Sequence, residues 1–251
     1  MTMNNIILKT DSYKVSHWKQ YPPKTQMIYS YLQSRGGEFD YSVFFGLQMI
    51  LKKHFLSPIV MDDINYAEVM FNKHFGNPTL FNRAGWEHIL NKHNGYLPIR
   101  IKAVPEGTVV PVGNVLMTIE NTDDNVPWLT NYVETLLMQV WYPTTVCTQS
   151  HLMKTIILDF LEQTGTPSSI DYKLHDFGYR GSTSHESAGI GGLAHLVNFK
   201  GTDTFAAIQA AKDYYSEDMA GHSIPAAEHS TITSWGKFNE VEAYKNMLEQ
   251  Y

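Results

Sequence analysis

The 251-residue sequence has a single cysteine, Cys147, so these residues cannot form a disulfide with one another. A protein of this kind suits a reducing compartment. Long apolar runs are also missing, and no window approaches the length that a membrane-spanning helix needs. The first residues, MTMNNIILKTDSYK, lack the charged start and apolar core of a secretory signal. These absences predict a cytoplasmic protein that does not enter a membrane.

The sequence also has no excess of positive charge. It contains 19 lysines and arginines against 25 aspartates and glutamates, which gives a formal net charge of -6. Proteins that bind nucleic acids or anionic membranes need basic patches, and no basic run occurs here. We therefore expect no nucleic-acid partner and no membrane partner. With 43% hydrophobic residues, the composition is that of a globular protein with a sizeable core.

Several catalytic signatures are absent or incomplete. There is no P-loop and no G-x-S-x-G elbow. The run GIGGLA at 189–194 fits the dinucleotide pattern G-x-G-x-x-G/A, but no apolar strand ends at Gly189, and we favour a helix whose small residues allow close packing on a sheet. His175, His185 and His195 are spaced so that no two share a helical turn. No metal-ligating residues are therefore predicted.

Residues 172–204 carry most of the polar chemistry. A short apolar start leads into a polar, glycine-containing loop at 175–181, and a helix is predicted to begin near Ser184. The apolar run 195–199 is typical of a buried parallel strand, and a second polar loop, 200–203, follows it. Two parallel strands joined by a helix place ligands at their carboxyl ends. We therefore expect the two loops to line one crevice.

The same order of elements repeats once more along the chain. A helix is predicted at 205–215, a short strand at 222–227, and a last helix capped by Ser230 or Thr231 that runs to Tyr251. Successive strands that each end in a polar cluster are typical of the catalytic face of an α/β barrel. The residues expected at this face are Asp176, Phe177, Arg180, Lys200 and Asp203, followed at the third strand end by Glu228 and His229.

The sequence leaves two interpretations open for several of these residues. Arg180 could grip a phosphate through its guanidinium, or it could be a surface arginine paired with Asp176. Phe177 could stack on an aromatic ligand, or it could fill the top of the barrel. Glu228 and His229 could supply a general base or a nucleophilic histidine, while a lone histidine is more often structural.

The preceding residues have the pattern of a mixed helical and β region. Apolar periodicity predicts helices at 43–55, 62–75, 82–92, 128–141 and 148–163, and alternation predicts strands at 6–8, 27–32, 99–103 and 115–119. We expect Pro143 to end the fourth helix. The stretch 164–169 is rich in Gly, Pro, Ser and Thr and is the best domain boundary. It divides the chain into a mixed α+β domain, 1–168, and an incomplete α/β barrel of three βα units, 169–251.

The sequence resembles nicotinamide phosphoribosyltransferases over nearly its whole length. The matching stretches are TDSYKVSHWKQYPP at 10–23, IKAVPEG at 101–107, KLHDFGYRG at 173–181, AHLVNFKGTDT at 194–204 and PAAEHSTIT at 225–233. The resemblance implies transfer of phosphoribose from phosphoribosyl pyrophosphate to nicotinamide, which forms nicotinamide mononucleotide and pyrophosphate in NAD salvage. It also implies an α/β fold of the type II phosphoribosyltransferase kind and a homodimer with active sites at the subunit interface.

The resemblance assigns roles around the nicotinamide ring. Phe177 would stack on one face of the pyridine ring, and Tyr13 of the partner subunit would cover the other. Asp203 would accept a hydrogen bond from the carboxamide, which disfavours nicotinate because two carboxylates would then meet. Arg180 would lie near the ring and the phosphates. Ser223 would also bind substrate.

Further roles implied by the resemblance concern phosphates and turnover. Asp11 and Arg35 would reach ribose and phosphate from the partner subunit, and Mg²⁺ would neutralise the leaving pyrophosphate. His229 would be phosphorylated by ATP, which would stimulate turnover. The expected catalytic residues are thus His229, Asp203 and Arg180, and the residues expected to support the site are His175, Asp176, Lys200 and Glu228.

Part of the family fold is expected to lie outside this sequence. Family chains are about twice as long, and a closed barrel of this kind has about eight βα units. We therefore expect activity to need the carboxyl-terminal half, supplied by a separate polypeptide or by the rest of a longer chain. Two alternatives stay open: an inactive fragment that acts as a dimerisation or ligand-binding module, and a nicotinate phosphoribosyltransferase.

Overall fold

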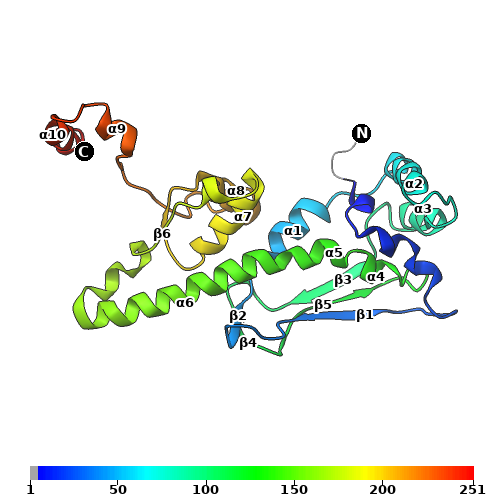
Figure 1. The fold of residues 1–251 in the computed structure, drawn as a ribbon. Helices are drawn as coiled ribbons and strands as arrows, with labels where there is room; N and C mark the ends of the chain where they lie inside the picture. The colour runs from blue at the N-terminus through cyan, green and yellow to red at the C-terminus, as the bar shows by residue number, and fades with distance from the viewer. Residues whose placement is uncertain (1–4) are drawn as a thin grey trace.

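The computed structural model describes residues 5–251. A mixture of helices and small antiparallel sheets forms the amino-terminal part, and short parallel strands with helices form the carboxyl-terminal part (Figure 1). The long helix α6 (Trp141–Thr164) connects the two parts and runs beneath α7 and α8 in the view of Figure 1. Across residues 5–251, the structure contains no helix with the length and apolar character that crossing a membrane demands.

The larger sheet has the strand order β1-β5-β3. Strands β1 (Tyr29–Gln33) and β3 (Ile99–Ala103) both run antiparallel to β5 (Val115–Asn121). A second antiparallel pair joins β2 (Tyr41–Val43) to β4 (Val109–Pro111). The alternating pattern therefore predicted β1, β3 and β5, but it missed β2 and β4, which are three residues each and too short to show a period.

Helices α2 (Met61–Phe75) and α3 (Arg83–Lys92) pack on each other and share a hydrophobic core with this sheet (Figure 1). The core between them is aromatic, because the Trp86 ring lies edge-on to Trp128 and Tyr132 with centroid separations of 5.0 and 5.1 Å. Such edge-to-face pairs stabilise a core beyond the area they bury. The packing holds the chain that leaves β5 firmly against α3.

Two predictions for the first 55 residues are wrong. Residues 6–8 form the 3-10 turn η1 (Ile6–Leu8), because the Asn5 side chain accepts a hydrogen bond from the Ile7 amide at 3.0 Å and bends the chain. The helix expected at 43–55 is shortened to α1 (Leu47–His54). Gly46 precedes it with φ 104°, a left-handed conformation that suits glycine and brings the backbone against Pro143.

The prediction of one helix at 128–141 is also wrong. The segment is a series of short turns, α4 (Leu129–Tyr132), α5 (Glu134–Leu137) and η3 (Met138–Val140). The apolar stripe that suggested one helix is buried, but successive short segments bury it. Pro143 does not end a helix either, because it lies in the first turn of α6, where a missing amide N–H leaves no intrahelical bond unmade.

The predicted βαβ unit is confirmed in the carboxyl-terminal part. Strands β6 (His175–Asp176) and β7 (Gly201–Thr202) are parallel and are joined by α7 (His185–Leu196), whose amino terminus is capped by the Ser184 side chain. Helix α8 (Phe205–Tyr215) has the predicted bounds. The predicted boundary near residue 168, which falls in the 3-10 segment η4 (Pro167–Tyr172), stays a prediction.

The strand predicted at 195–199 is wrong. Helix α7 continues to Leu196, a turn follows, and the buried Phe199 ring stacks on the His195 ring at 5.0 Å. The strand is instead the two-residue β7, which was expected to be part of a loop. A short apolar run is compatible with a buried helix end as well as with a buried strand, and hydrophobicity alone does not separate them.

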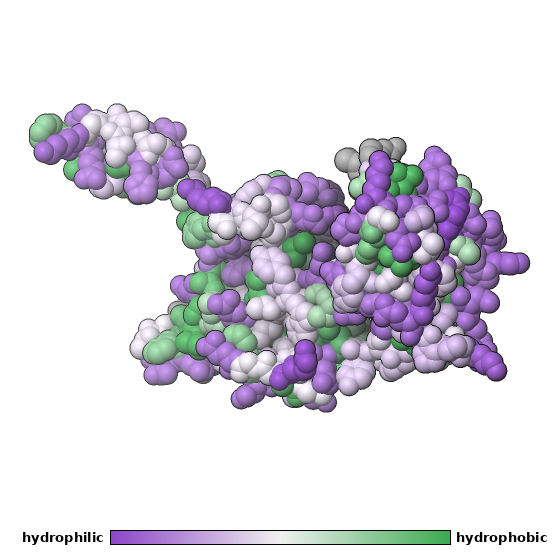
Figure 2. Space-filling view, turned by 45° about the vertical axis from the view of Figure 1, so that its right-hand side comes forward, coloured by the Kyte–Doolittle hydropathy of each residue, from purple (hydrophilic) through white to green (hydrophobic). Residues whose placement is uncertain are grey.

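The third strand and the last helix are also shorter than predicted. The strand is a single parallel bridge between Gly201 and His222. The helix is divided into α9 (His229–Thr233), preceded by Glu228, and α10 (Glu240–Gln250). Together α9 and α10 form a lobe that stands away from α7 and α8, joined to them by a narrow neck (Figures 1 and 2).

Candidate active site

Three strand ends bring together His175, Asp203 and Ser223, which we call the Asp203 cluster. His175 lies in β6, Asp203 follows β7, and Ser223 follows the bridge at His222. His175 Nε2 is 2.9 Å from Asp203 Oδ1, and the Ser223 hydroxyl donates to the same oxygen. The parallel register accounts for this meeting, since the Asp203 amide donates to the Asp176 carbonyl at 2.9 Å.

The hydrogen bonds at this cluster determine its charge. Those from Ser223 and then His175 hold the pKa of the Asp203 carboxyl below its ordinary value, so the group is ionised at neutral pH. Both bonds go to Oδ1. Within residues 5–251 no hydrogen-bond partner is found for Oδ2, and the side chain is 39% exposed. This oxygen can therefore accept a hydrogen bond from a ligand.

An aromatic ring stands beside the cluster. Phe177 is 65% exposed, and its ring centroid lies 4.6 Å from that of His175. The ring does not fill the top of a barrel in this chain, so the interpretation as a stacking surface is the one that its exposure favours. A cleft of about 740 Å³ opens next to it, lined by Phe177, His175 and Asp176 and floored by the glycines of α7.

The loop after β6 presents a cation to solvent. Asp176 Oδ1 accepts a hydrogen bond from the Gly178 amide at 2.8 Å and closes a tight turn before η5 (Tyr179–Gly181). Arg180 is exposed, and no ion pair or hydrogen bond of its guanidinium occurs within residues 5–251. The pairing of Arg180 with Asp176 is therefore not formed, and the guanidinium is available to an anion.

Three residues predicted for this face do not join the Asp203 cluster. Lys200 pairs with Asp171 at 3.1 Å, which raises the pKa of the lysine and anchors its loop to η4. Glu228 and His229 lie at the start of α9, in the lobe that is separated from β6 and β7 (Figure 1). His229 is exposed there.

The residues predicted to reach a neighbouring subunit have no hydrogen bond or ion pair with the Asp203 cluster within residues 5–251. Tyr13, in the 3-10 helix η2 (Ser12–Lys19), is 57% exposed. Asp11 accepts a hydrogen bond from the Thr135 hydroxyl at 2.6 Å, and Arg35 borders a cavity of about 340 Å³ after β1. Figure 1 shows the dark-blue amino-terminal segment at the opposite side of the molecule from β6. One chain alone does not bring these residues to Asp203.

Sequence reasoning missed the supporting role of His195. Its side chain is buried, with Nδ1 3.0 Å from the Ser150 hydroxyl and Nε2 3.2 Å from the Leu174 carbonyl. Burial lowers the pKa of His195, so the ring is neutral at neutral pH. The ring thus connects α6 and α7 to the start of β6. No local pattern reveals this, because both partners are distant in sequence.

Two family profiles match separate parts of the chain. The profile described as "Nicotinamide phosphoribosyltransferase, N-terminal domain" matches residues 5–101. The profile of the "Nicotinate phosphoribosyltransferase (NAPRTase) family" matches residues 172–251, which contain the Asp203 cluster. Both descriptions name phosphoribosyltransferases of pyridine substrates.

Curated relatives carry the first of these names. A nicotinamide phosphoribosyltransferase of Xanthomonas campestris pv. campestris is 54% identical over 99% of this chain. Those of Acinetobacter baylyi and Mycoplasma pneumoniae are 32% and 31% identical over 95% and 98% of it. The chain covers 53%, 50% and 57% of these relatives, so it spans about half the length of the curated relatives it matches.

The fold is shared with a solved structure. Human nicotinic acid phosphoribosyltransferase superposes with a TM-score of 0.58 at 16% identity, over 90% of this chain and 40% of that chain. This likeness confirms the predicted fold class, a mixed amino-terminal part followed by the first units of an α/β barrel of the type II phosphoribosyltransferase kind. From the profiles and the relatives together, the chain is similar to the amino-terminal portion of nicotinamide phosphoribosyltransferases.

Proposed function

We propose that this chain forms the nicotinamide-binding part of a nicotinamide phosphoribosyltransferase, which makes nicotinamide mononucleotide and pyrophosphate from nicotinamide and phosphoribosyl pyrophosphate in cytoplasmic NAD salvage. The observation that carries the proposal is that one residue, His175, contacts both an ionised carboxylate and an exposed aromatic ring. Its Nε2 atom bonds to Asp203, and its ring lies against that of Phe177. A pyridine carboxamide offers one group to each: a flat ring for Phe177 and an N–H₂ donor for Asp203.

Asp203 favours the amide over the acid. Its Oδ2 faces solvent without a partner in the described chain, so a carboxamide N–H₂ can donate to it. Nicotinate would place a second negative charge against a carboxylate whose pKa is already held below its ordinary value. Nicotinate phosphoribosyl transfer remains the second candidate, because the family profile over residues 172–251 and the human structure carry that name.

The reaction makes modest demands on proton transfer. The neutral pyridine nitrogen of nicotinamide already has a lone pair, which forms the bond to the ribose C1 carbon as the bond from C1 to pyrophosphate breaks. No proton has to be removed from the nucleophile, so the residues of this chain are needed mainly to hold and orient the ring. We assign phosphate binding near the reacting carbon to Arg180, which is exposed and has no ion pair within residues 5–251.

Mg²⁺ is proposed to arrive with the pyrophosphate group rather than to bind at the Asp203 cluster. The cluster offers one carboxylate, one hydroxyl and one imidazole that are already bonded to one another. Mg²⁺ prefers a shell of oxygen ligands that includes substrate phosphates and water. The side chains of the Asp203 cluster do not provide this oxygen shell, so we assign no magnesium ligand to this chain.

The active site is proposed to be completed by other chains. Tyr13 and Asp11 lie in the amino-terminal segment, away from β6, and Arg35 makes no hydrogen bond or ion pair with the Asp203 cluster within residues 5–251, so a second copy is the source that the family resemblance suggests for them. His229 is exposed at the start of α9, where ATP could reach it for phosphorylation. The carboxyl-terminal half of the family's chain would supply the remaining barrel strands.

The proposal is tested by measuring nicotinamide mononucleotide formation with Mg²⁺, with and without ATP. We expect little product from this chain alone and product after a carboxyl-terminal half from a family member is added. In the complemented enzyme, Asp203→Asn should lower kcat/KM for nicotinamide by about tenfold or more. It should also lower the ratio of kcat/KM for nicotinamide to kcat/KM for nicotinate. The Asn amide can donate to a carboxylate, whereas Asp203 repels it.

Each other outcome points to a different function. Nicotinamide binding that is lost in Phe177→Ala, without product under any complementation, would identify an inactive ligand-binding module. Faster turnover of nicotinate than of nicotinamide in the wild type would establish the second candidate. Full ATP stimulation in His229→Ala would exclude His229 as the phosphorylated residue.

A further inference from the structure

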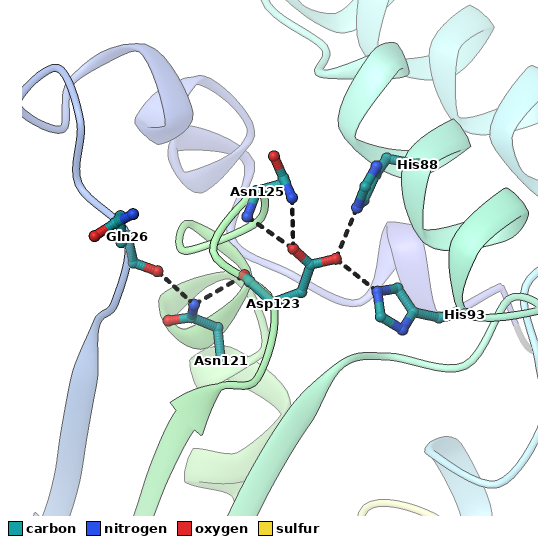
Figure 3. A network of polar contacts seen from close by, with 6 residues as sticks. All are labelled: Gln26, His88, His93, Asn121, Asp123 and Asn125. Atoms are coloured by element: carbon teal, nitrogen blue, oxygen red, sulfur yellow. Dashed lines mark hydrogen bonds and ion pairs between the residues drawn. The ribbon is translucent and has the colours of Figure 1, made fainter.

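A second polar cluster lies in the amino-terminal part, on elements that take no part in the Asp203 cluster. It consists of His88 on α3, His93 just after α3, and Asp123 in the turn after β5 (Figure 3). His88 Nε2 and His93 Nε2 lie 2.7 and 2.6 Å from the same carboxylate oxygen, Asp123 Oδ2. The three side chains converge on one point from two separate elements.

The carboxylate is held in place by its own turn. The backbone and side-chain N–H groups of Asn125 both donate to Asp123 Oδ1 at 2.8 Å. The side chain of Asn121, which is 1% exposed, donates to the Asp123 carbonyl at 3.0 Å and to the Gln26 carbonyl at 2.8 Å. Figure 3 shows these bonds on the side of Asp123 opposite the histidines. Oδ2 is thereby directed at the two imidazoles.

We propose that His88, His93 and Asp123 bind a divalent transition metal ion, with Zn²⁺ as the expected ion. Two imidazole nitrogens and one carboxylate oxygen are ligands that Zn²⁺ prefers, and three protein ligands leave a fourth position for water. The ligand atoms all lie within 4.8 Å of one another. A tetrahedral ion with bonds of about 2.0–2.2 Å keeps its ligands about 3.3–3.6 Å apart, so small movements of the two rings admit it.

Hydrogen bonds keep the Asp123 carboxyl ionised. Burial alone would raise the pKa of Asp123, but hydrogen bonds from His93, Asn125 and His88 outweigh it and hold this pKa well below its ordinary value. Without an ion, His88 and His93 bond to Asp123 through Nε2, so a ring that binds a metal through this atom has to carry its proton on Nδ1 instead. The hydrogen bonds from Asn125 to Asp123 Oδ1 would orient the carboxylate for coordination through Oδ2.

The surroundings favour a transition metal over Mg²⁺ or Ca²⁺. Those ions require oxygen-rich shells, whereas two of the three ligands here are nitrogens. The side chains of His88, His93 and Asp123 are 27%, 30% and 13% exposed, so an ion can enter from solvent. A bound ion would tie the end of α3 to the turn after β5, and we therefore assign it a structural role in the amino-terminal part.

Direct metal binding tests this assignment. The chain is prepared without a polyhistidine tag, treated with a chelator, and titrated with Zn²⁺ by calorimetry. We expect one ion per chain, and binding at least about tenfold weaker in His88→Gln, His93→Gln and Asp123→Asn. Asn125→Ala keeps all three ligands and should still weaken binding about 10–100-fold. His74→Gln, which removes an exposed histidine on α2, is the matched control and should bind as the wild type does.

Two further readouts separate coordination from loss of structure. Co²⁺ bound in place of Zn²⁺ should give the strong visible absorption of a four-coordinate ion in the wild type and not in His93→Gln, while far-UV circular dichroism shows that both chains are folded. Zn²⁺ should raise the Tm of the wild type, and Mg²⁺ at the same concentration should not. The assignment is overturned if the wild type shows no saturable binding, or if the ligand variants bind Zn²⁺ as tightly as His74→Gln does.

Discussion

The two oxygens of Asp203 have different surroundings. Oδ1 takes both protein hydrogen bonds, from Ser223 and His175, while Oδ2 is left toward solvent. The protein thus fixes the carboxylate through one oxygen and offers the other to a ligand. A residue with this arrangement keeps its charge and its direction even though the side chain is partly exposed.

Because its pKa is depressed, Asp203 should bind nicotinamide over a wide pH range. Hydrogen bonds to the ionised form are fully present above the ordinary carboxyl pKa of about 3.9 and are lost only as the pH falls through the lower folded value. Ser223→Ala removes the hydrogen bond that lowers the pKa of Asp203 most. Loss of nicotinamide binding should therefore begin at a higher pH in this variant than in the wild type. Nicotinamide binding followed from pH 7 downward measures this difference.

The comparison applies only where both chains are folded, which circular dichroism establishes at each pH. Phe177→Leu is a useful reference, because it weakens ring stacking without touching Asp203. Its pH midpoint should equal that of the wild type. A midpoint in Ser223→Ala that is equal to or lower than the wild-type midpoint contradicts the role given to Ser223.

The sequence predicted Asp203 at a strand end, but it placed Glu228 and His229 rather than Ser223 at the end of the third strand. His175, Asp203 and Ser223 meet as expected of residues at the carboxyl ends of parallel strands. Lys200 occupies the same kind of position and is instead paired with Asp171. Its pairing depends on a residue 29 positions earlier in the chain, and no local pattern encodes such a contact.

The small residues of α7 allow it to pack closely on α8. The glycine pattern of 189–194 was interpreted as close packing rather than as a nucleotide site, and the structure has α7 packed closely on α8. A Cβ on Gly192 would lie 2.8 Å from the Ala207 Cβ and 2.9 Å from Asp176 Oδ2. Gly192 therefore packs against α8 and against Asp176 of β6, whereas the sequence predicted packing on the face of a sheet.

Gly192→Ala should therefore destabilise the fold and disturb the cleft. An added methyl group at such short separations forces α7 away from α8, and overpacking of this kind costs about 1–3 kcal/mol. The free energy of unfolding from urea titration measures the loss. Gly181→Ala is the matched control, since its Cβ would meet nothing within 4 Å. Equal stability of the two variants would mean that α7 can shift without cost.

The limits of prediction at this scale have physical causes. Long helices such as α2 and α3 were predicted closely, because their apolar period is repeated several times. Strands β6 and β7 contain two residues each, and no period can appear in two residues. The contact of His88 and His93 with Asp123 joins residues 35 and 30 positions apart, so it also had no local signal.

At the scale of the whole molecule, the carboxyl-terminal lobe is poorly covered. Among the residues of α9 and α10 only Ala243 is buried, and α10 packs on α9 within the lobe. Phe238 and Leu248 are 91% and 84% exposed, and Ile224 in the neck is 74% exposed. Side chains of this type are buried in most folded proteins, so we expect a partner surface to cover them in the assembled enzyme.

Limited proteolysis with a nonspecific protease tests this expectation. Cleavage should begin in the neck, residues 216–228, because it has few backbone hydrogen bonds to protect it. The fragment that ends there should keep the Asp203 amide bond and the packing of α7 on α8, since neither involves α9 or α10. If the carboxyl-terminal half of a family member docks on the lobe, adding it should slow cleavage of the neck several-fold, because only the undocked population is cut. First cleavage within α6, or an unchanged rate with the added half, would show that the lobe is not where the rest of the barrel binds.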